Sequence, residues 1–139
     1  MKIIEGDICD AKEKYILHQC NCVSHGAKGV AKAIFERYPY SNTYKYGIRK
    51  PGTIDIMDGE KIIINVYAQY YPGLCKYNDT KEMRLKWFEE CIDKVLMLNI
   101  NEIAIPYNIG CGHAGGDFED YLKILQKLDE KINITLYKL

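Results

Sequence analysis

Two short segments of this 139-residue chain combine glycine with polar side chains in a pattern that suits a phosphate ligand. In the first, the apolar run that ends at Pro106 leads into Tyr107-Asn108-Ile109-Gly110-Cys111-Gly112-His113-Ala114-Gly115-Gly116-Asp117. Glycine allows the backbone to turn tightly and to approach a ligand closely. A helix that begins near Asp117 would add unpaired backbone N–H groups, which bind phosphate. We therefore predict a phosphate cradle here.

The second segment lies near the N-terminus and has the same order of elements. Tyr15 to Cys20 reads as a short apolar strand, Asn21 to Gly29 as a loop of small residues, and Val30 to Tyr38 as a helix. Asn21 carries donors and acceptors in one head, which suits a ribose, although an Asn can also cap its own loop. Loops at strand ends of an open α/β sheet usually border one crevice, so we predict a nucleotide diphosphate site between them.

Other candidate groups have more than one interpretation. The unperturbed pKa of histidine lies near neutrality, so His18 is a candidate acid or base, or a hydrogen-bonded core residue. Asp117 is a candidate acid or a helix cap. Cys111 is best interpreted as a small residue that fills a tight loop, although a nearby helix could lower its pKa. The six cysteines lack the paired spacings of a zinc site, so we expect reduced thiols and no metal.

Strands alternate with helices along the chain, which predicts the α/β class. Asp58-Gly59 predicts a hairpin, so the sheet should be mixed, and the apolar runs 62–64 and 103–105 predict strands covered on both faces. Asp79 and Glu82 resemble a capping pair ahead of the longest helix. The expected strands are 2–5, 14–20, 53–57, 61–67, 102–107 and 132–137, and the expected helices are 29–38, 81–98 and 117–130. The stripe expected to face the core from the longest helix is Met83, Trp87, Cys91, Val95 and Leu98.

Composition excludes several classes of function. Lys plus Arg and Asp plus Glu both total 19, so the chain is neutral and has no general affinity for duplex nucleic acid. No apolar run approaches membrane-spanning length, and the N-terminus lacks the apolar segment of a signal peptide. We therefore expect a cytoplasmic, monomeric protein with one domain.

Five separated motifs together resemble a macrodomain, the ADP-ribose-binding α/β/α module. In chain order they are Gly6-Asp7-Ile8, His18-Gln19-Cys20-Asn21, Gly26-Ala27-Lys28-Gly29-Val30-Ala31, Ile105 to Gly112, and Thr135-Leu136-Tyr137-Lys138-Leu139. The resemblance implies a single macrodomain over residues 1–139, with three layers around a central mixed six-stranded sheet. The chain is most similar to small stand-alone macrodomains described as ADP-ribose-1″-phosphate phosphatases or Appr-1″-p processing proteins.

The resemblance also implies a role for each motif. Asp7 would accept a hydrogen bond from the adenine amino group, with the backbone of Ile8 beside it. Asn21 would lie against the distal ribose, and Asp117 resembles the catalytic acid of glycohydrolase macrodomains, which leaves hydrolysis without a lysine open. With His18, which is a candidate from its own chemistry, Asn21 and Asp117 are the expected catalytic residues. The other implied ligand-binding residues are Lys28, Gly29, Val30, Pro106, Ile109, Gly110, Cys111, Gly112, His113, Ala114, Tyr137 and Leu139.

Three activities are compatible with this resemblance. The first is hydrolysis of ADP-ribose-1″-phosphate to ADP-ribose and phosphate without a cofactor, and the second is binding or sequestration of ADP-ribose without turnover. The third is a glycohydrolase that removes ADP-ribose from protein or nucleic acid. Glycohydrolase macrodomains of the antitoxin class, which act on DNA, carry a lysine where alignment places Gln69. Glutamine cannot form the covalent adduct, so a lysine-dependent mechanism is not expected.

Overall fold

The computed structural model describes all 139 residues and is built on one six-stranded sheet, with strand order β1-β6-β5-β2-β4-β3. All neighbouring strands are parallel except β3 and β4, which form the predicted antiparallel hairpin. The mixed sheet is thus confirmed. The strands are β1 (Lys2–Glu5), β2 (Tyr15–Cys20), β3 (Ile54–Met57), β4 (Ile62–Tyr67), β5 (Glu102–Pro106) and β6 (Asn133–Lys138).

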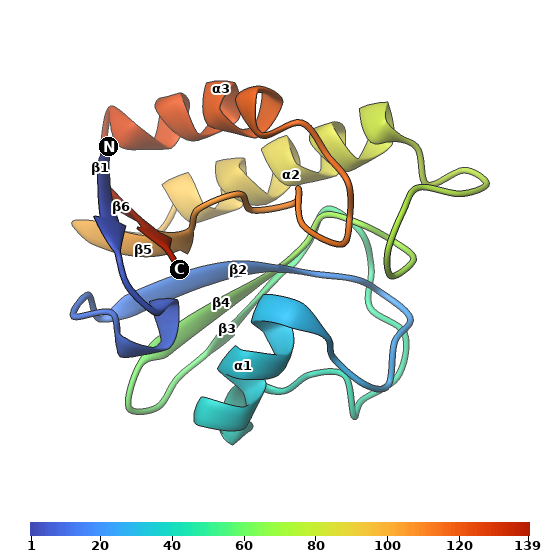
Figure 1. Cartoon of the computed structure of the whole chain (residues 1–139), viewed down its shortest axis with the longest axis horizontal. Helices are drawn as coiled ribbons and strands as arrows, with labels where there is room; N and C mark the ends of the chain where they lie inside the picture. Colours follow the sequence, from blue (N-terminus) through green and yellow to red (C-terminus); the bar gives the residue numbers. More distant parts are fainter.

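Helices cover both faces of the sheet and give three layers (Figure 1). One core cluster packs α2 (Lys81–Leu96) and α3 (Phe118–Asp129) against the sheet, and a second packs α1 (Gly29–Arg37) against the opposite face. Two short 3-10 helices, η1 (Ile8–Asp10) and η2 (Pro39–Ser41), complete the elements. The runs 63–64 and 103–105 are fully buried, because β4 and β5 lie inside the sheet and are covered from both sides.

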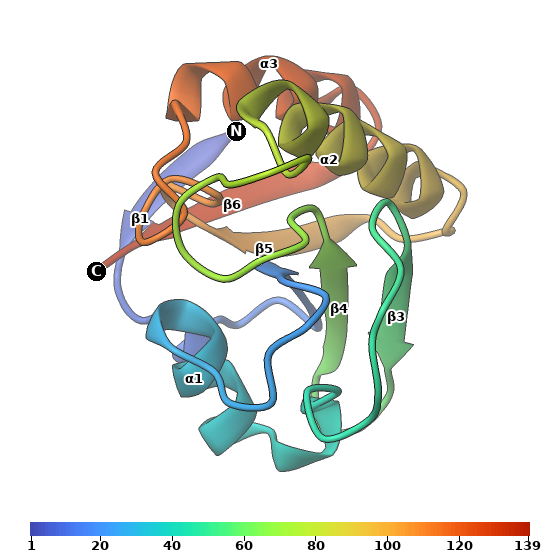
Figure 2. The same ribbon diagram turned by 90° about the vertical axis from the view of Figure 1, so that its right-hand side faces the viewer.

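The parallel strands β1, β6, β5, β2 and β4 all end at one edge of the sheet. The loops that follow β2, β4 and β5 therefore gather at that edge, between α1 on one side and α2 and α3 on the other (Figure 2). This is the edge at which open α/β sheets bind ligands.

The predicted cap of α2 is wrong. Thr80 caps this helix, because its Oγ1 accepts a hydrogen bond from the Met83 N–H at 3.1 Å. Asp79 is buried instead, and its carboxylate lies 2.7 Å from Nε of Arg84. The predicted core stripe is confirmed in part. Cys91 and Val95 are fully buried, and Trp87 and Leu98 are half-buried against the core. Arg84 rather than Met83 turns inward at the start of the helix. The fully buried residues of α2 are Arg84, Phe88, Cys91, Ile92 and Val95.

No helix in the structure combines the length and the apolar character that crossing a bilayer requires.

Candidate ligand-binding site

A cavity of about 940 Å³ lies at the carboxyl edge of the sheet, within the size range of small-molecule sites. Its wall comes from the loops after β2, β4 and β5, the first residues of α1, and Tyr44. Both loops predicted from sequence thus border the same cavity. Twelve of the residues predicted from sequence to act on or bind a ligand lie in the wall of this cavity. They are His18, Asn21, Lys28, Gly29, Val30, Pro106, Ile109, Gly110, Cys111, Gly112, His113 and Ala114.

The charge of the chain is distributed unevenly around this cavity. None of its 23 lining residues is Asp or Glu. The stretches of sequence that supply the wall also contain no acidic residue, although the chain as a whole is neutral. These acid-free stretches are 14–35, 37–54, 61–78 and 103–116. The cavity therefore suits an anionic ligand.

The two loops meet where Gly29 approaches His113. Gly29 has φ +59°, and a Cβ at this position would lie 3.1 Å from Cδ2 of the His113 ring. Any side chain at position 29 would thus be strained and would also displace the His113 ring. A small residue at this position keeps the two walls of the cavity in contact.

Unpaired backbone N–H groups line both walls. Those of 112–114 donate to no group in the protein, and neither do those of 29–31 at the start of α1. Lys28, the N-cap residue of α1, makes no side-chain capping bond, so these donors are free for an anion. The prediction that the helix after Asp117 supplies such donors is wrong, because no residue of α3 lines the cavity. Asp117 caps α3 by accepting from the Glu119 N–H at 3.1 Å.

The glycine-rich loop rests on an aromatic ring. Gly110 has φ +76°, and a Cβ there would lie 2.5 Å from the ring of Tyr121 on α3. Gly116 is enclosed by the same ring and by the carbonyl of Gly110. Tyr121 therefore requires glycine at these positions, and it holds the loop in the shape that leaves its N–H groups free.

Asn21 lines the cavity, but most of its hydrogen-bonding capacity is already used. Its Oδ1 accepts from the backbone N–H groups of Val23 at 3.1 Å and Ser24 at 2.8 Å. Its Nδ2 donates to the hydroxyl of Tyr44 at 3.2 Å. Asn21 thus caps its own loop, as one interpretation of the sequence expected, and it also faces the cavity.

His18 lines the cavity from β2 and is almost completely buried. Its Nε2 donates to Oδ1 of Asn65 at 2.6 Å, because the Asn65 amide nitrogen is already directed to the Ser41 carbonyl. Burial lowers the pKa of His18 to about 4, against the opposing effect of the Asn65 hydrogen bond. The expectation that His18 titrates near neutrality is wrong, and the side chain is neutral at physiological pH.

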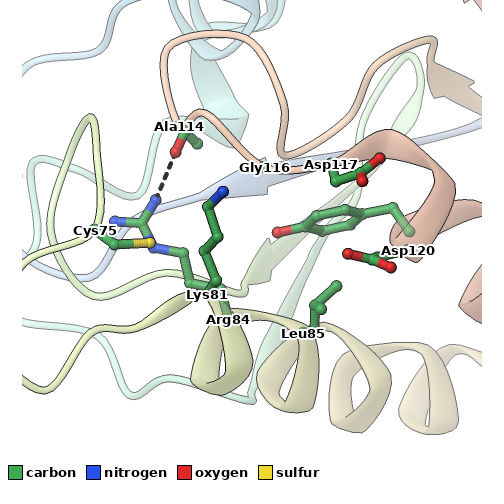
Figure 3. A pocket seen from close by; sticks show the side chains of 9 residues that line it. Cys75, Lys81, Arg84, Leu85, Ala114, Gly116, Asp117 and Asp120 are labelled. Carbon is green, nitrogen blue, oxygen red and sulfur yellow. Dashed lines mark hydrogen bonds between the residues drawn. The ribbon is translucent and has the colours of Figure 1, made fainter.

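The structure does not bring Asp117 into the cavity. Its exposed carboxylate lines a separate pocket of about 20 Å³ between α2 and α3, which has room for one water (Figure 3). Asp120 and Lys81 line the same small pocket. Cys111, by contrast, lines the large cavity, where burial and the charges of Asp117 and Asp120 raise its pKa to about 12. Cys111 is therefore a protonated thiol, consistent with a space-filling role.

Four other predicted residues lie beside the cavity rather than in its wall. Asp7 follows β1 and accepts from the Cys9 N–H at 2.9 Å, and Ile8 is buried beneath it. Tyr137 is in β6, and its hydroxyl donates to Glu13 at 2.6 Å, while Leu139 is fully exposed. These strand ends adjoin β5, whose Pro106 lines the cavity.

Gln69, which the family resemblance aligned with a lysine, lines the cavity. Its Oε1 accepts from Nε2 of Gln19 at 2.7 Å, and its Nε2 donates to the Tyr71 carbonyl at 2.9 Å. The side chain is held as a neutral amide and supplies no nucleophile.

Three residues of the site region were missed from sequence. Tyr44 and Arg49 lie in the segment between η2 and β3, which contains no glycine-rich motif or strand pattern. Arg84 is buried, and its Nη1 donates to the carbonyl of Gly73 at 2.8 Å. It also donates to the carbonyl of Ala114 at 3.3 Å (Figure 3). The signal that could have revealed it is its spacing, because Arg84 shares the helix face of Phe88, Cys91 and Val95, which is otherwise apolar.

The sequence matches no protein-family model and no curated protein. Solved structures do match. The macrodomain of Mycobacterium tuberculosis DarG superimposes with a TM-score of 0.71 at 25% identity, over 98% of this chain and 95% of that chain. This chain has the macrodomain fold.

Two further structures extend this similarity. The chain superimposes on the structure described as Alphavirus P23pro-zbd with a TM-score of 0.73 at 24% identity, over 98% of this chain and 21% of that chain. It thus spans about a fifth of the alphavirus chain. Thermosipho africanus DarTG in complex with ADP-ribose gives a TM-score of 0.64 at 16% identity, over 99% of this chain and 42% of that chain. Identities this low establish a shared fold rather than a shared activity.

Proposed function

We propose that this macrodomain binds ADP-ribose or a close derivative in the 940 Å³ cavity. The observation that carries the proposal is the meeting of two sets of free backbone N–H groups, at 29–31 and 112–114, where Gly29 approaches His113. A diphosphate accepts hydrogen bonds from such groups without a metal ion. The acid-free wall suits its negative charge, and the Thermosipho africanus structure of the same fold is described as a complex with ADP-ribose.

The proposed ligand crosses the sheet edge. Its diphosphate lies between the two loops, and its distal ribose lies toward Asn21 and Lys28. Its adenosine lies toward Pro106, where Asp7 would accept from the adenine amino group. The neighbouring strand ends place Ile8, Tyr137 and Leu139 on the same side.

Hydrolysis of ADP-ribose-1″-phosphate, the activity of the Appr-1″-p processing type, is the second candidate. It is favoured by His113, whose exposed imidazole in the wall is a candidate general acid for the departing oxygen. Two observations weigh against it. The cavity wall contains no carboxylate to activate water, and His18 is neutral. Binding without turnover is therefore the activity that the site supports best.

Removal of ADP-ribose from a macromolecule is the third candidate. The acid-free stretches that flank the cavity expose Tyr46 and Tyr77 together with Lys45 and Lys76, which favours an anionic carrier. Gln69 excludes attack by lysine, so this activity would have to use water directly.

One set of measurements separates the three candidates. The purified protein is mixed in turn with ADP-ribose, ADP-ribose-1″-phosphate and an ADP-ribosylated carrier, and binding heat, phosphate release and carrier demodification are followed. We expect binding heat with ADP-ribose, no release of phosphate and no demodification of the carrier. If phosphate is released, Asn21→Ala should abolish the release and leave most of the affinity. If no ligand responds, the nucleotide assignment is wrong.

The adenine end can be tested separately. Asp7→Ala is expected to weaken AMP and ADP-ribose binding alike by about 10-fold, because a charge-assisted hydrogen bond is lost. Asp10→Ala is the matched control, since Asp10 is an exposed residue of the same 3-10 turn and pairs with Arg37. Equal affinities in wild type and Asp7→Ala, measured by calorimetry, would remove Asp7 from the site.

A further inference from the structure

Tyr44 occupies a key position in the cavity wall, directly beside Asn21. It is only 2% exposed, and the hydroxyl oxygen contacts Asn21 twice. The Asn21 backbone N–H donates to it at 2.9 Å, and Nδ2 donates at 3.2 Å. Neither contact follows from local sequence, because the two residues are 23 positions apart.

The orientation of the Asn21 amide is determined by its partners. The backbone N–H groups of Val23 and Ser24 can only donate, so the atom that they contact must be the amide oxygen. The amide nitrogen therefore faces Tyr44 and gives it one hydrogen. Its second N–H has no acceptor in the protein.

The same reasoning applies to Tyr44. Because both contacts from Asn21 are donors, the phenolic oxygen acts as acceptor in both, and only its own O–H is left. Within the protein this hydroxyl is in hydrogen-bonding reach of the Cys20 thiol, and sulfur is a weak acceptor. Burial raises the pKa of Tyr44, so the hydroxyl keeps its proton and remains a donor.

Arg49 holds Tyr44 and Asn21 in this relative position. Its guanidinium carbon lies 4.6 Å from the centre of the Tyr44 ring. The two terminal nitrogens of Arg49 donate only to backbone carbonyls, including those of Asn21 at 3.3 Å and Ser24 at 2.8 Å. Arg49 also donates to the backbone carbonyls of Tyr46 and Gly47. It therefore joins the segment that contains Tyr44 to the loop that contains Asn21.

We propose that Tyr44 is a specificity-determining residue, because with Asn21 it presents two hydrogen-bond donors and no free acceptor to the ligand. The pair selects a group with acceptor oxygens, such as the ring, hydroxyl or phosphate oxygens of a distal sugar. This rests on the proposed function, which places the distal ribose at Asn21. A ligand that ends at the second phosphate does not use this contact.

The test compares ADP-ribose with ADP, which lacks the distal ribose. Tyr44→Phe keeps the ring beneath Arg49 but removes the hydroxyl. We expect the affinity for ADP-ribose to fall by about 10-fold and the affinity for ADP to change by less than about 2-fold. The matched control is Tyr38→Phe, since Tyr38 is equally buried but donates to the Cys9 carbonyl and does not line the cavity.

A second measurement uses the wild-type protein and does not depend on how the variant folds. In NMR spectra, the side-chain NH2 resonances of Asn21 should shift with ADP-ribose and stay in place with ADP. The inference about Tyr44 is wrong if Tyr44→Phe loses equal affinity for both ligands or for neither. It is also wrong if the Asn21 amide resonances do not shift with ADP-ribose. Each of these results leaves the proposed function standing. Wild-type protein that binds neither ligand would overturn the proposed function as well.

Discussion

His18 reaches the cavity from β2 with its ring enclosed by the sheet and by α1. Phe35 on α1 lies edge-on to the imidazole, with ring centres 5.3 Å apart. The Nε2 proton is directed to Asn65, and water has almost no access to the ring. These surroundings favour the neutral form, so His18 can orient a neighbour or a ligand but cannot carry a proton at physiological pH.

Replacing His18 should change how stability depends on pH. The unfolded chain binds a proton near pH 6.5, whereas the folded protein resists it until about pH 4, so wild-type stability falls as the pH drops through this window. The loss is about 3 kcal/mol across the window. We expect His18→Gln to lack this component in urea titrations, while His25→Gln, at an exposed position, retains it. Parallel pH profiles for wild type and His18→Gln would contradict the assignment.

At the scale of elements, Arg84 joins α2 to two loops. Its side chain pairs with Asp79, whose Oδ2 also accepts from the backbone N–H groups of Tyr70 and Tyr71. Its Nη1 reaches across to Ala114 in the glycine-rich loop. The loop after β4 and the loop after β5 are therefore held together as one wall of the cavity.

Breaking this junction should destabilise the protein strongly. Arg84→Met leaves the Asp79 carboxylate buried without its partner, and we expect a loss of about 3–5 kcal/mol in the free energy of unfolding. Arg37→Met is the control, because Arg37 makes an exposed pair with Asp10 that contributes at most about 1 kcal/mol. Urea denaturation measures both. A loss in Arg84→Met no larger than in Arg37→Met would show that the junction is not needed.

At the scale of the whole molecule, the acidic residues are distributed unevenly although the chain has no net charge. The chain has 19 acidic and 19 basic residues, yet every acidic residue lies outside the four stretches that supply the cavity wall. The parallel strands carry these stretches to one edge, where α1 directs its uncapped N-terminus. An anion at this edge meets Lys28, free backbone N–H groups and no carboxylate in the wall, although the protein has no net charge.

Salt should therefore weaken the binding of charged ligands selectively. Raising NaCl from about 50 mM to about 500 mM is expected to lower the affinity for ADP-ribose by about 3- to 10-fold, because mobile ions screen the field at the cavity mouth. Adenosine, which is neutral, serves as the control and should bind equally at both salt concentrations. An ADP-ribose affinity that is independent of salt would show that backbone contacts alone carry the interaction.

The order of helices and strands could be read from sequence because it depends on local patterns. Apolar runs such as 62–64 and 103–105 predict buried strands, and the glycines around Cys111 predict a loop that approaches a ligand. The parallel arrangement then requires the loops after β2 and β5 to share one edge. The macrodomain resemblance rested on the same local motifs.

The tertiary structure decided which groups meet and in what state. It directed the N-terminus of α1 rather than α3 at the cavity, left Asp117 outside it, and lowered the pKa of His18. It also brought Tyr44 to Asn21 and Arg84 to Ala114, across separations of 23 and 30 residues. Burial and pairing depend on neighbours that are distant along the chain, so local sequence patterns determine the elements and only packing determines the chemistry at their ends.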